Sequence, residues 1–253
     1  MGSWRRAQAA AVPPALRTFL GLVAALAALV VLVLGILYAG DSTPDALDAR
    51  LGAEAYDVGQ SWRNVALALD FLGEPAGSVA LVTALVTGCL LLRRPRTAVL
   101  LVAGTATSVG TATLLKSLVG RTIHGDNLSY PSGHTAFATT LALVVALTAA
   151  GRPGLGRPAG TSLVLASAVS AGTAMGWAEV ALSAHYPTDA LGGWCTALAV
   201  TPATAWLVDK AADRVTARTA GRRAGGPDDD RPSDPTAGRM TGRMAEAGRG
   251  EHR

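Results

Sequence analysis

Three short polar clusters interrupt a chain that is otherwise rich in long apolar runs. They are Lys116-Ser-Leu-Val-Gly-Arg121, Pro131-Ser132-Gly133-His134 and His185-Tyr186-Pro187-Thr188-Asp189. The segment that contains them, residues 116–189, holds three of the 4 histidines of the chain and one of its two lysines. Scarce ionisable residues gathered beside apolar segments indicate a functional site, here one suited to an anion.

The composition is that of a membrane protein. Half of the residues are hydrophobic, only 16% are charged, and the mean hydropathy is +0.33. Aromatic residues make up 5%, so the apolar runs consist mainly of Ala, Leu, Val, Gly and Thr. Small residues of this kind allow helices to approach closely within a bilayer. An ordinary soluble domain is therefore excluded, and an all-α integral membrane bundle is predicted.

Apolar runs long enough to cross a bilayer predict six transmembrane helices, since a span needs about 17–25 residues. The runs cover residues 16–38, 77–92, 97–115, 134–150, 161–177 and 188–208. The sequence thus predicts a short N-terminal segment at 1–15 and a six-span membrane domain at 16–208.

Basic residues predict how the bundle is oriented. Arginine and lysine cluster in alternate connections: Arg5, Arg6, Arg93, Arg94, Arg96, Arg152, Arg157, Lys210, Arg214 and Arg218. The positive-inside bias assigns these connections, with both termini, to the cytoplasm. All three polar clusters then fall on the extracytoplasmic face of a multi-pass protein in the cell membrane.

Two further segments differ from the spans. The acidic loop at 40–76 has apolar positions at helical spacing, which predicts one or two short amphipathic helices at the membrane surface. Residues 209–253 have almost no large apolar side chains, which predicts a disordered cytoplasmic tail.

Cys89 and Cys195 lie inside predicted spans and are expected to be buried. No Cys-x-x-Cys or Cys/His spacing is present, so a zinc site is not expected.

The second cluster has the features of an anion site at the start of a helix. The backbone N–H groups there, together with the Ser132 hydroxyl, can surround an anion. Gly133 lets the backbone approach a phosphate closely. His134 is placed to protonate a leaving oxygen. The alternative is a serine-capped helix with a histidine at the membrane interface.

The third and first clusters supply a nucleophile and positive charge. Asp189 can hold one imidazole nitrogen of His185, which leaves the other nitrogen free to attack. The alternative is a structural His–Asp pair. Lys116 and Arg121 can neutralise the charge that develops on a phosphate, or they can extend towards headgroups from the end of a span.

In this order, the three clusters resemble the motifs of the type 2 phosphatidic acid phosphatase superfamily, which includes vanadium haloperoxidases. Its pattern is Lys-x6-Arg-Pro, then Pro-Ser-Gly-His, then Ser-Arg-x5-His-x3-Asp. The positions that match are Lys116, Pro131, Ser132, Gly133, His134, His185 and Asp189. The resemblance covers residues 16–208 and includes the six-span layout.

The resemblance implies a membrane phosphatase that acts through a phosphohistidine. His185 would be the nucleophile, Asp189 would orient it, and His134 would be the general acid and then the base. Lys116, Ser132 and the Gly133 N–H would hold phosphate oxygens, with Arg121 assisting. The implied substrate is a lipid phosphate or a polyprenyl (di)phosphate. No metal, cofactor or nucleic acid is implied.

Two positions depart from this pattern. Ile123 and Glu179 stand where the family has phosphate-binding arginines. Glu179 is expected to repel phosphate unless it pairs with Arg121 or carries a proton. A non-catalytic descendant that binds lipid or a partner protein, and a phosphotransferase that uses the same histidine, are therefore the alternatives to a hydrolase.

Overall fold

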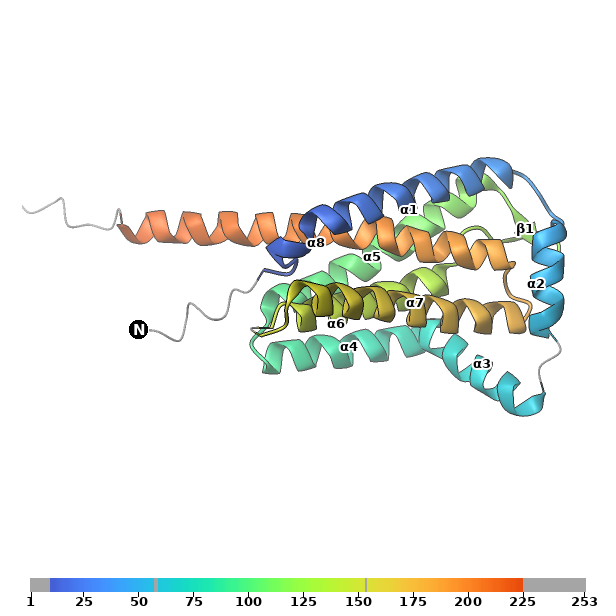
Figure 1. Cartoon of the computed structure of the whole chain (residues 1–253), viewed down its shortest axis with the longest axis horizontal. Helices are drawn as coiled ribbons and strands as arrows, with labels where there is room; N and C mark the ends of the chain where they lie inside the picture. Colours follow the sequence, from blue (N-terminus) through green and yellow to red (C-terminus); the bar gives the residue numbers. More distant parts are fainter. Residues whose placement is uncertain (1–9, 57–58, 153, 225–253) are drawn as a thin grey trace, which may run out of the picture. The chain divides into compact units, whose positions relative to one another are not determined.

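The computed structural model describes residues 10–56, 59–152 and 154–224, and almost all of its regular structure is helical. The helices are α1 (Arg17–Leu37), α2 (Ala46–Tyr56), α3 (Gln60–Gly73), α4 (Pro75–Leu91), α5 (Pro95–Val119), α6 (Gly133–Ala150), α7 (Arg157–Ala181) and α8 (Pro187–Ala224). A 3-10 turn, η2 (Pro14–Leu16), precedes α1. A small hairpin, β1 (Thr122–Ile123) and β2 (Asn127–Leu128), separates α5 from α6 (Figure 1).

The chain forms two compact units, Met1–Ala212 and Asp213–Arg253. The first unit contains the bundle, and the described part of the second is the last portion of α8. All three polar clusters lie in the first unit.

Helix α6 is the centre of the bundle. It packs against both α5 and α7, and 61% of its most apolar stretch is buried, against 22% for α1. Hydroxyl groups join the helices in this core: Thr140 Oγ1 donates to Ser108 Oγ at 2.8 Å and lies 3.1 Å from Thr201 Oγ1. Such bonds hold apolar helices together where no water competes for the polar groups.

Within the described residues, five helices are long and apolar enough to cross a membrane, and the bent pair α3–α4 brings the number to six if it counts as one span. The two helices of this pair meet at an angle of 68°. The outward face of α1 is a row of exposed apolar side chains: Leu22, Leu26, Leu29, Leu32 and Ile36. Lipid is the medium in which such a surface is stable. The predicted all-α membrane bundle is confirmed.

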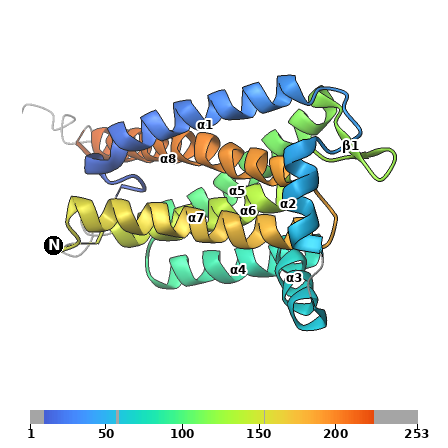
Figure 2. The ribbon, with the colours of Figure 1, turned by 45° about the vertical axis from the view of Figure 1, so that its right-hand side comes forward.

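The loop at 40–76 contains two helices, α2 and α3, and the hairpin lies at the same end of the bundle (Figures 1 and 2). Helix α2 packs on α7, while α3 packs on α6 and α7. Helices α2 and α3 and the hairpin therefore cover this end of the bundle, and the three polar clusters lie beneath them.

The prediction that a disordered tail begins at residue 209 is wrong at its start, because α8 continues to Ala224. Asp209 is buried and accepts backbone N–H groups of Ala11 and Val12 at 2.7 and 3.1 Å. The following residues are rich in alanine and arginine, which favour helix without requiring a core. Residues 225–253, like 1–9, lie outside the described residues.

Candidate active site

The start of α6 is fixed by the residues that were expected to bind an anion. Ser132 is the N-cap: its Oγ accepts the N–H of Thr135 at 3.2 Å and donates to Thr135 Oγ1 at 3.1 Å. The Ser132 N–H donates to the backbone oxygen of Asp189 at 2.9 Å, so α6 and α8 begin side by side. Ser132 is fully buried by these contacts. Its hydroxyl therefore caps the helix, whereas the space beside Gly133 is open.

His134 faces three carboxylates. Its Nε2 lies 3.7 Å from Asp70 Oδ1 and 3.8 Å from Glu74 Oε1, and its Nδ1 lies 3.7 Å from Glu179 Oε2. Asp70 and Glu74 come from the α3–α4 bend, and Glu179 comes from the last turn of α7. The side chain of His134 is one-quarter exposed, so it is accessible from outside the bundle.

His185 lies across the same carboxylate from His134. Its Nε2 is 3.4 Å from Glu179 Oε2, and its Nδ1 is 3.6 Å from Asp189 Oδ2. Both imidazoles thus lie within 3.7 Å of the same oxygen atom, Glu179 Oε2. Burial lowers the pKa of His185, although the Asp189 carboxylate opposes this effect. A buried imidazole is held neutral in this way, which is the form able to attack phosphorus.

Arg121 is fully buried and forms ion pairs with two acids. Its Nη1 donates to Asp189 Oδ1 at 2.8 Å and its Nη2 to Asp48 Oδ2 at 2.6 Å. The guanidinium also lies between the rings of Tyr38 and Tyr186, with its central carbon 3.9 and 4.4 Å from the ring centroids. These contacts differ from the expected ones, since Arg121 pairs with Asp48 and Asp189 and not with Glu179.

The same ion pairs anchor the start of α8. Asp48 Oδ1 accepts the Thr188 N–H at 2.9 Å, and its Oδ2 accepts the Thr188 hydroxyl at 2.8 Å. Asp189 Oδ2 accepts the Tyr186 N–H at 3.0 Å. A carboxylate near a helix N-terminus stabilises it through these N–H groups and the helix dipole. Arg121 and Asp48 therefore position Asp189, and through it His185.

Lys116, the other basic residue of the first cluster, contacts the hairpin. Lys116 Nζ donates to the Leu128 carbonyl at 3.0 Å. Ile123, which replaces a family arginine, is buried in β1 and brings no charge. His124 is exposed, and its Nε2 lies 2.8 Å from the Ser183 carbonyl, which links the hairpin to the loop before His185.

Two glycines allow the close packing of this site. A Cβ on Gly73 would overlap the imidazole of His134, and a Cβ on Gly193 would overlap the backbone oxygen of Ser132. The first glycine lets α3 cover His134. The second lets α8 lie against the turn before α6.

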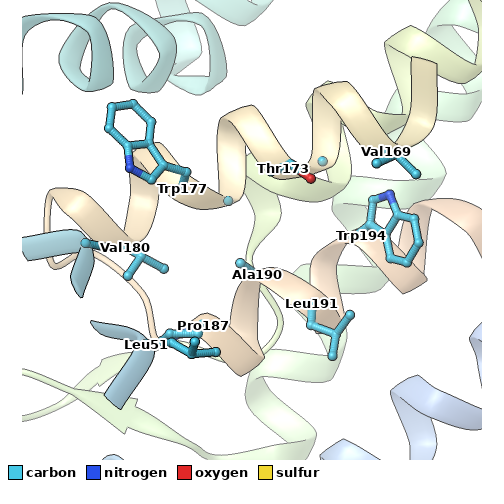
Figure 3. Close-up of a pocket in the computed structure, with 12 residues that line it drawn as sticks. Leu51, Val169, Thr173, Trp177, Val180, Pro187, Ala190, Leu191 and Trp194 are labelled. Atoms are coloured by element: carbon cyan, nitrogen blue, oxygen red, sulfur yellow. The ribbon is translucent and has the colours of Figure 1, made fainter. Parts of the chain in front are cut away.

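An apolar pocket of about 520 Å³ lies between α2, α7 and α8 (Figure 3). Its lining residues are Leu51, Ala55, Val169, Gly172, Thr173, Gly176, Trp177, Val180, Pro187, Ala190, Leu191 and Trp194. Val180 follows Glu179 in the chain, and Ala190 follows Asp189. The pocket therefore borders the backbone that carries the polar site.

The sequence placed His134, His185 and Asp189 in one site, and the structure brings them together. The sequence analysis did not identify Asp48, Asp70 or Glu74 as members of that site. The available signal was the excess of acidic over basic residues in the first loop. Helical spacing alone does not say which acids turn inward.

One solved structure and one family model are similar to this chain. The structure is similar to the crystal structure of the first transmembrane PAP2 type phosphatidylglycerolphosphate phosphatase from Bacillus subtilis. The TM-score is 0.59 at 21% sequence identity, and the match covers 76% of this chain and 96% of the other. None of the curated proteins matches the chain in sequence. A sequence model of the PAP2 superfamily matches residues 16–213, most of the chain, so this membrane protein belongs to the PAP2 superfamily.

Proposed function

We propose that the protein is a membrane phosphatase that hydrolyses a lipid phosphate or a polyprenyl (di)phosphate through a phosphohistidine. The observation that carries this proposal is that His185 lies between Asp189 and Glu179, with the partly exposed His134 beside the same Glu179 oxygen. Family membership and the likeness to a phosphatidylglycerolphosphate phosphatase support the reaction class. The positive-inside bias of the loops supports an extracytoplasmic site.

In the first step, Nε2 of neutral His185 attacks phosphorus while Asp189 holds the Nδ1 side of the ring. The bond from phosphorus to the lipid oxygen breaks, and protonated His134 gives its proton to that oxygen. In the second step, water attacks the phosphohistidine and passes a proton to His134. The phosphorus–nitrogen bond breaks, which releases inorganic phosphate and neutral His185.

The apolar pocket supports a lipid substrate. Its walls are almost wholly apolar, and the two helices that form most of it, α7 and α8, also carry Glu179 and Asp189. We infer that a hydrocarbon chain of the substrate lies in this pocket while its phosphate reaches His185. Lateral entry from the bilayer follows, since α7 and α8 are both candidate spans.

The test is phosphate release by the purified protein in detergent from phosphatidic acid, phosphatidylglycerol phosphate and a polyprenyl diphosphate. Wild type is expected to release phosphate from at least one of them, and His185→Ala from none. A folded wild-type protein that releases none would favour the non-catalytic alternative. Transfer of phosphate to an added alcohol, without release, would favour the phosphotransferase.

A further inference from the structure

Glu179 is a buried acid whose ion-pair partners, among the described residues, are two imidazoles and no lysine or arginine. Its side chain is 1% exposed, and its Oε1 is buried without a hydrogen-bond partner within the described part of the chain. Its Oε2 lies 3.7 Å from Nδ1 of His134 and 3.4 Å from Nε2 of His185. Both distances exceed the usual hydrogen-bond range of about 2.7–3.2 Å. An ionised carboxylate is costly to bury unless it is paired and hydrogen-bonded, and a bound proton removes that cost.

Either a pair with Arg121 or a bound proton would let Glu179 stand beside a phosphate without repelling it. Arg121 pairs instead with Asp48 and Asp189. Lys116 donates its hydrogen bond to a carbonyl of the hairpin. Neither basic residue of the first cluster therefore forms an ion pair with Glu179, and the bound proton is the way that remains.

The other ionisable groups around Glu179 add negative charge. They are Asp70 and Glu74 at the α3–α4 bend, Lys116 of α5, His134 of α6 and His185 before α8, while Asp48 of α2 and Asp189 of α8 are paired with Arg121. Carboxyl oxygens of Asp70 and Glu179 lie within 4.8 Å of each other, and two like charges this close favour a proton on one of them. Asp70 is one-quarter exposed, so water solvates its charge, and the proton belongs on the buried Glu179.

The imidazoles do not supply the positive charge that an ionised Glu179 would need. Burial lowers the pKa of His185, which keeps this ring neutral. His134 can carry one positive charge, but Asp70 and Glu74 lie beside its other nitrogen. One imidazolium would therefore face three carboxylates, before a phosphate adds further negative charge.

We propose that Glu179 carries a proton and, as a neutral acid, donates a hydrogen bond to an oxygen of the substrate phosphate. This inference rests on the proposed function, and it gives Glu179 the phosphate-binding role that an arginine has in the family pattern. Because Glu179 Oε2 lies 3.4 Å from His185 Nε2, a phosphorus atom that approaches this nitrogen brings a phosphate oxygen within reach of Glu179. Hydrogen bonds to an ionised acceptor are stronger than those between neutral groups. The proton stays on Glu179 throughout, so His134 remains free to serve the leaving group and the attacking water.

Protonation is tested by infrared spectroscopy of the detergent-solubilised protein at neutral pH. A protonated carboxyl group has a C=O stretching band that a carboxylate lacks, and this band shifts when the solvent is heavy water. Wild type is expected to show the band, and Glu179→Gln is expected to lack it. Glu54→Gln removes an exposed acid of α2 and is expected to keep the band. Asp70→Asn removes the neighbouring like charge, so its band should disappear at a lower pH than that of wild type.

The donor role is tested by the binding of inorganic phosphate, followed through the broadening of its phosphorus NMR line. At neutral pH, Glu179→Gln keeps a donor of similar shape and is expected to bind within about threefold of wild type, whereas Glu179→Ala should bind about tenfold more weakly or worse. As the pH rises, wild type should lose affinity relative to Glu179→Gln, which has no ionisable group at this position. The ratio of the two affinities cancels the ionisation of phosphate itself. Far-ultraviolet circular dichroism checks that each variant remains helical.

A wild-type spectrum without the protonated carboxyl band at neutral pH, or an unchanged band in Glu179→Gln, would overturn the inference. Equal phosphate affinity in Glu179→Gln and Glu179→Ala would overturn the donor role. Phosphate release that depends on His185, in a protein without the band, would leave the phosphatase proposal standing. Both expected results, with no phosphate release from any lipid, would keep Glu179 as a phosphate-binding acid and overturn the phosphatase proposal.

Discussion

The Oε2 atom of Glu179 lies 3.4 Å from Nε2 of His185, the nitrogen that we propose attacks phosphorus. A carboxylate there occupies space that a phosphate oxygen needs in the reaction. The substrate must therefore displace Glu179 or approach with its charge compensated. The site therefore differs from one in which an arginine at this position binds the phosphate.

Replacing Arg121 is expected to affect the fold more than phosphate binding. Arg121→Gln leaves Asp48 and Asp189 buried without their cation, and loss of one partner of a buried pair costs about 3–5 kcal/mol. Thermal unfolding in detergent measures the change, with the exposed Arg63→Gln of α3 as the control. A variant as stable as wild type, but with a raised KM, would return Arg121 to the phosphate-binding role.

Adding a methyl group at Gly73 is expected to displace His134, because a Cβ there overlaps the imidazole. Misplacing a catalytic group by about 1 Å can cost roughly 100-fold in rate, so kcat of Gly73→Ala should fall by about 10- to 100-fold. Gly21→Ala is the matched control, since a Cβ at that position of α1 meets no atom within 4 Å. Equal kcat values for the two variants would mean that the position of His134 does not limit the reaction.

The pH profile should reflect the burial of His185. Its pKa is lowered, so the neutral nucleophile persists below the ordinary value of about 6.5. The acid limb of kcat/KM is therefore expected below pH 6.5. The stability contributed by neutral His185 is complete above that pH and is lost as the pH falls through the lowered pKa. An acid limb above pH 6.5 would assign the controlling group elsewhere.

Filling the apolar pocket should discriminate between substrates by chain length. Thr173→Trp places a large ring in the pocket, whereas Ala174→Trp alters an exposed neighbour outside its lining. We expect Thr173→Trp to raise the KM for long-chain lipids. The KM for a short-chain, water-soluble phosphate should stay unchanged. Equal effects on both substrates, or equal effects of both variants, would place the hydrocarbon chain elsewhere.

The helices, and the three polar clusters as candidates for one site, could be predicted from the sequence because each depends on a local pattern. Apolar runs predicted α1, α5, α6, α7 and α8, and the first-loop periodicity predicted α2 and α3. The contacts of Asp48 and Asp70 could not be read in this way. They depend on how α2 packs over the start of α8 and on the 68° bend between α3 and α4, which no local pattern encodes. The burial of Arg121 could not be predicted either, since a basic residue after a span usually faces headgroups.

The ion pair between Arg121 and Asp189 bears on how relatives of this chain should be interpreted. Asp189 is needed to start α8 and to neutralise a buried guanidinium, whatever chemistry the site performs. Selection for a stable fold would preserve it even in a lineage that had lost catalysis. Retention of Asp189 is therefore a poor marker of an active descendant. Within the described part of the chain, the side chains of His185 and His134 hold no helix start, so their presence or absence in a relative is the better indicator of whether it still turns over substrate.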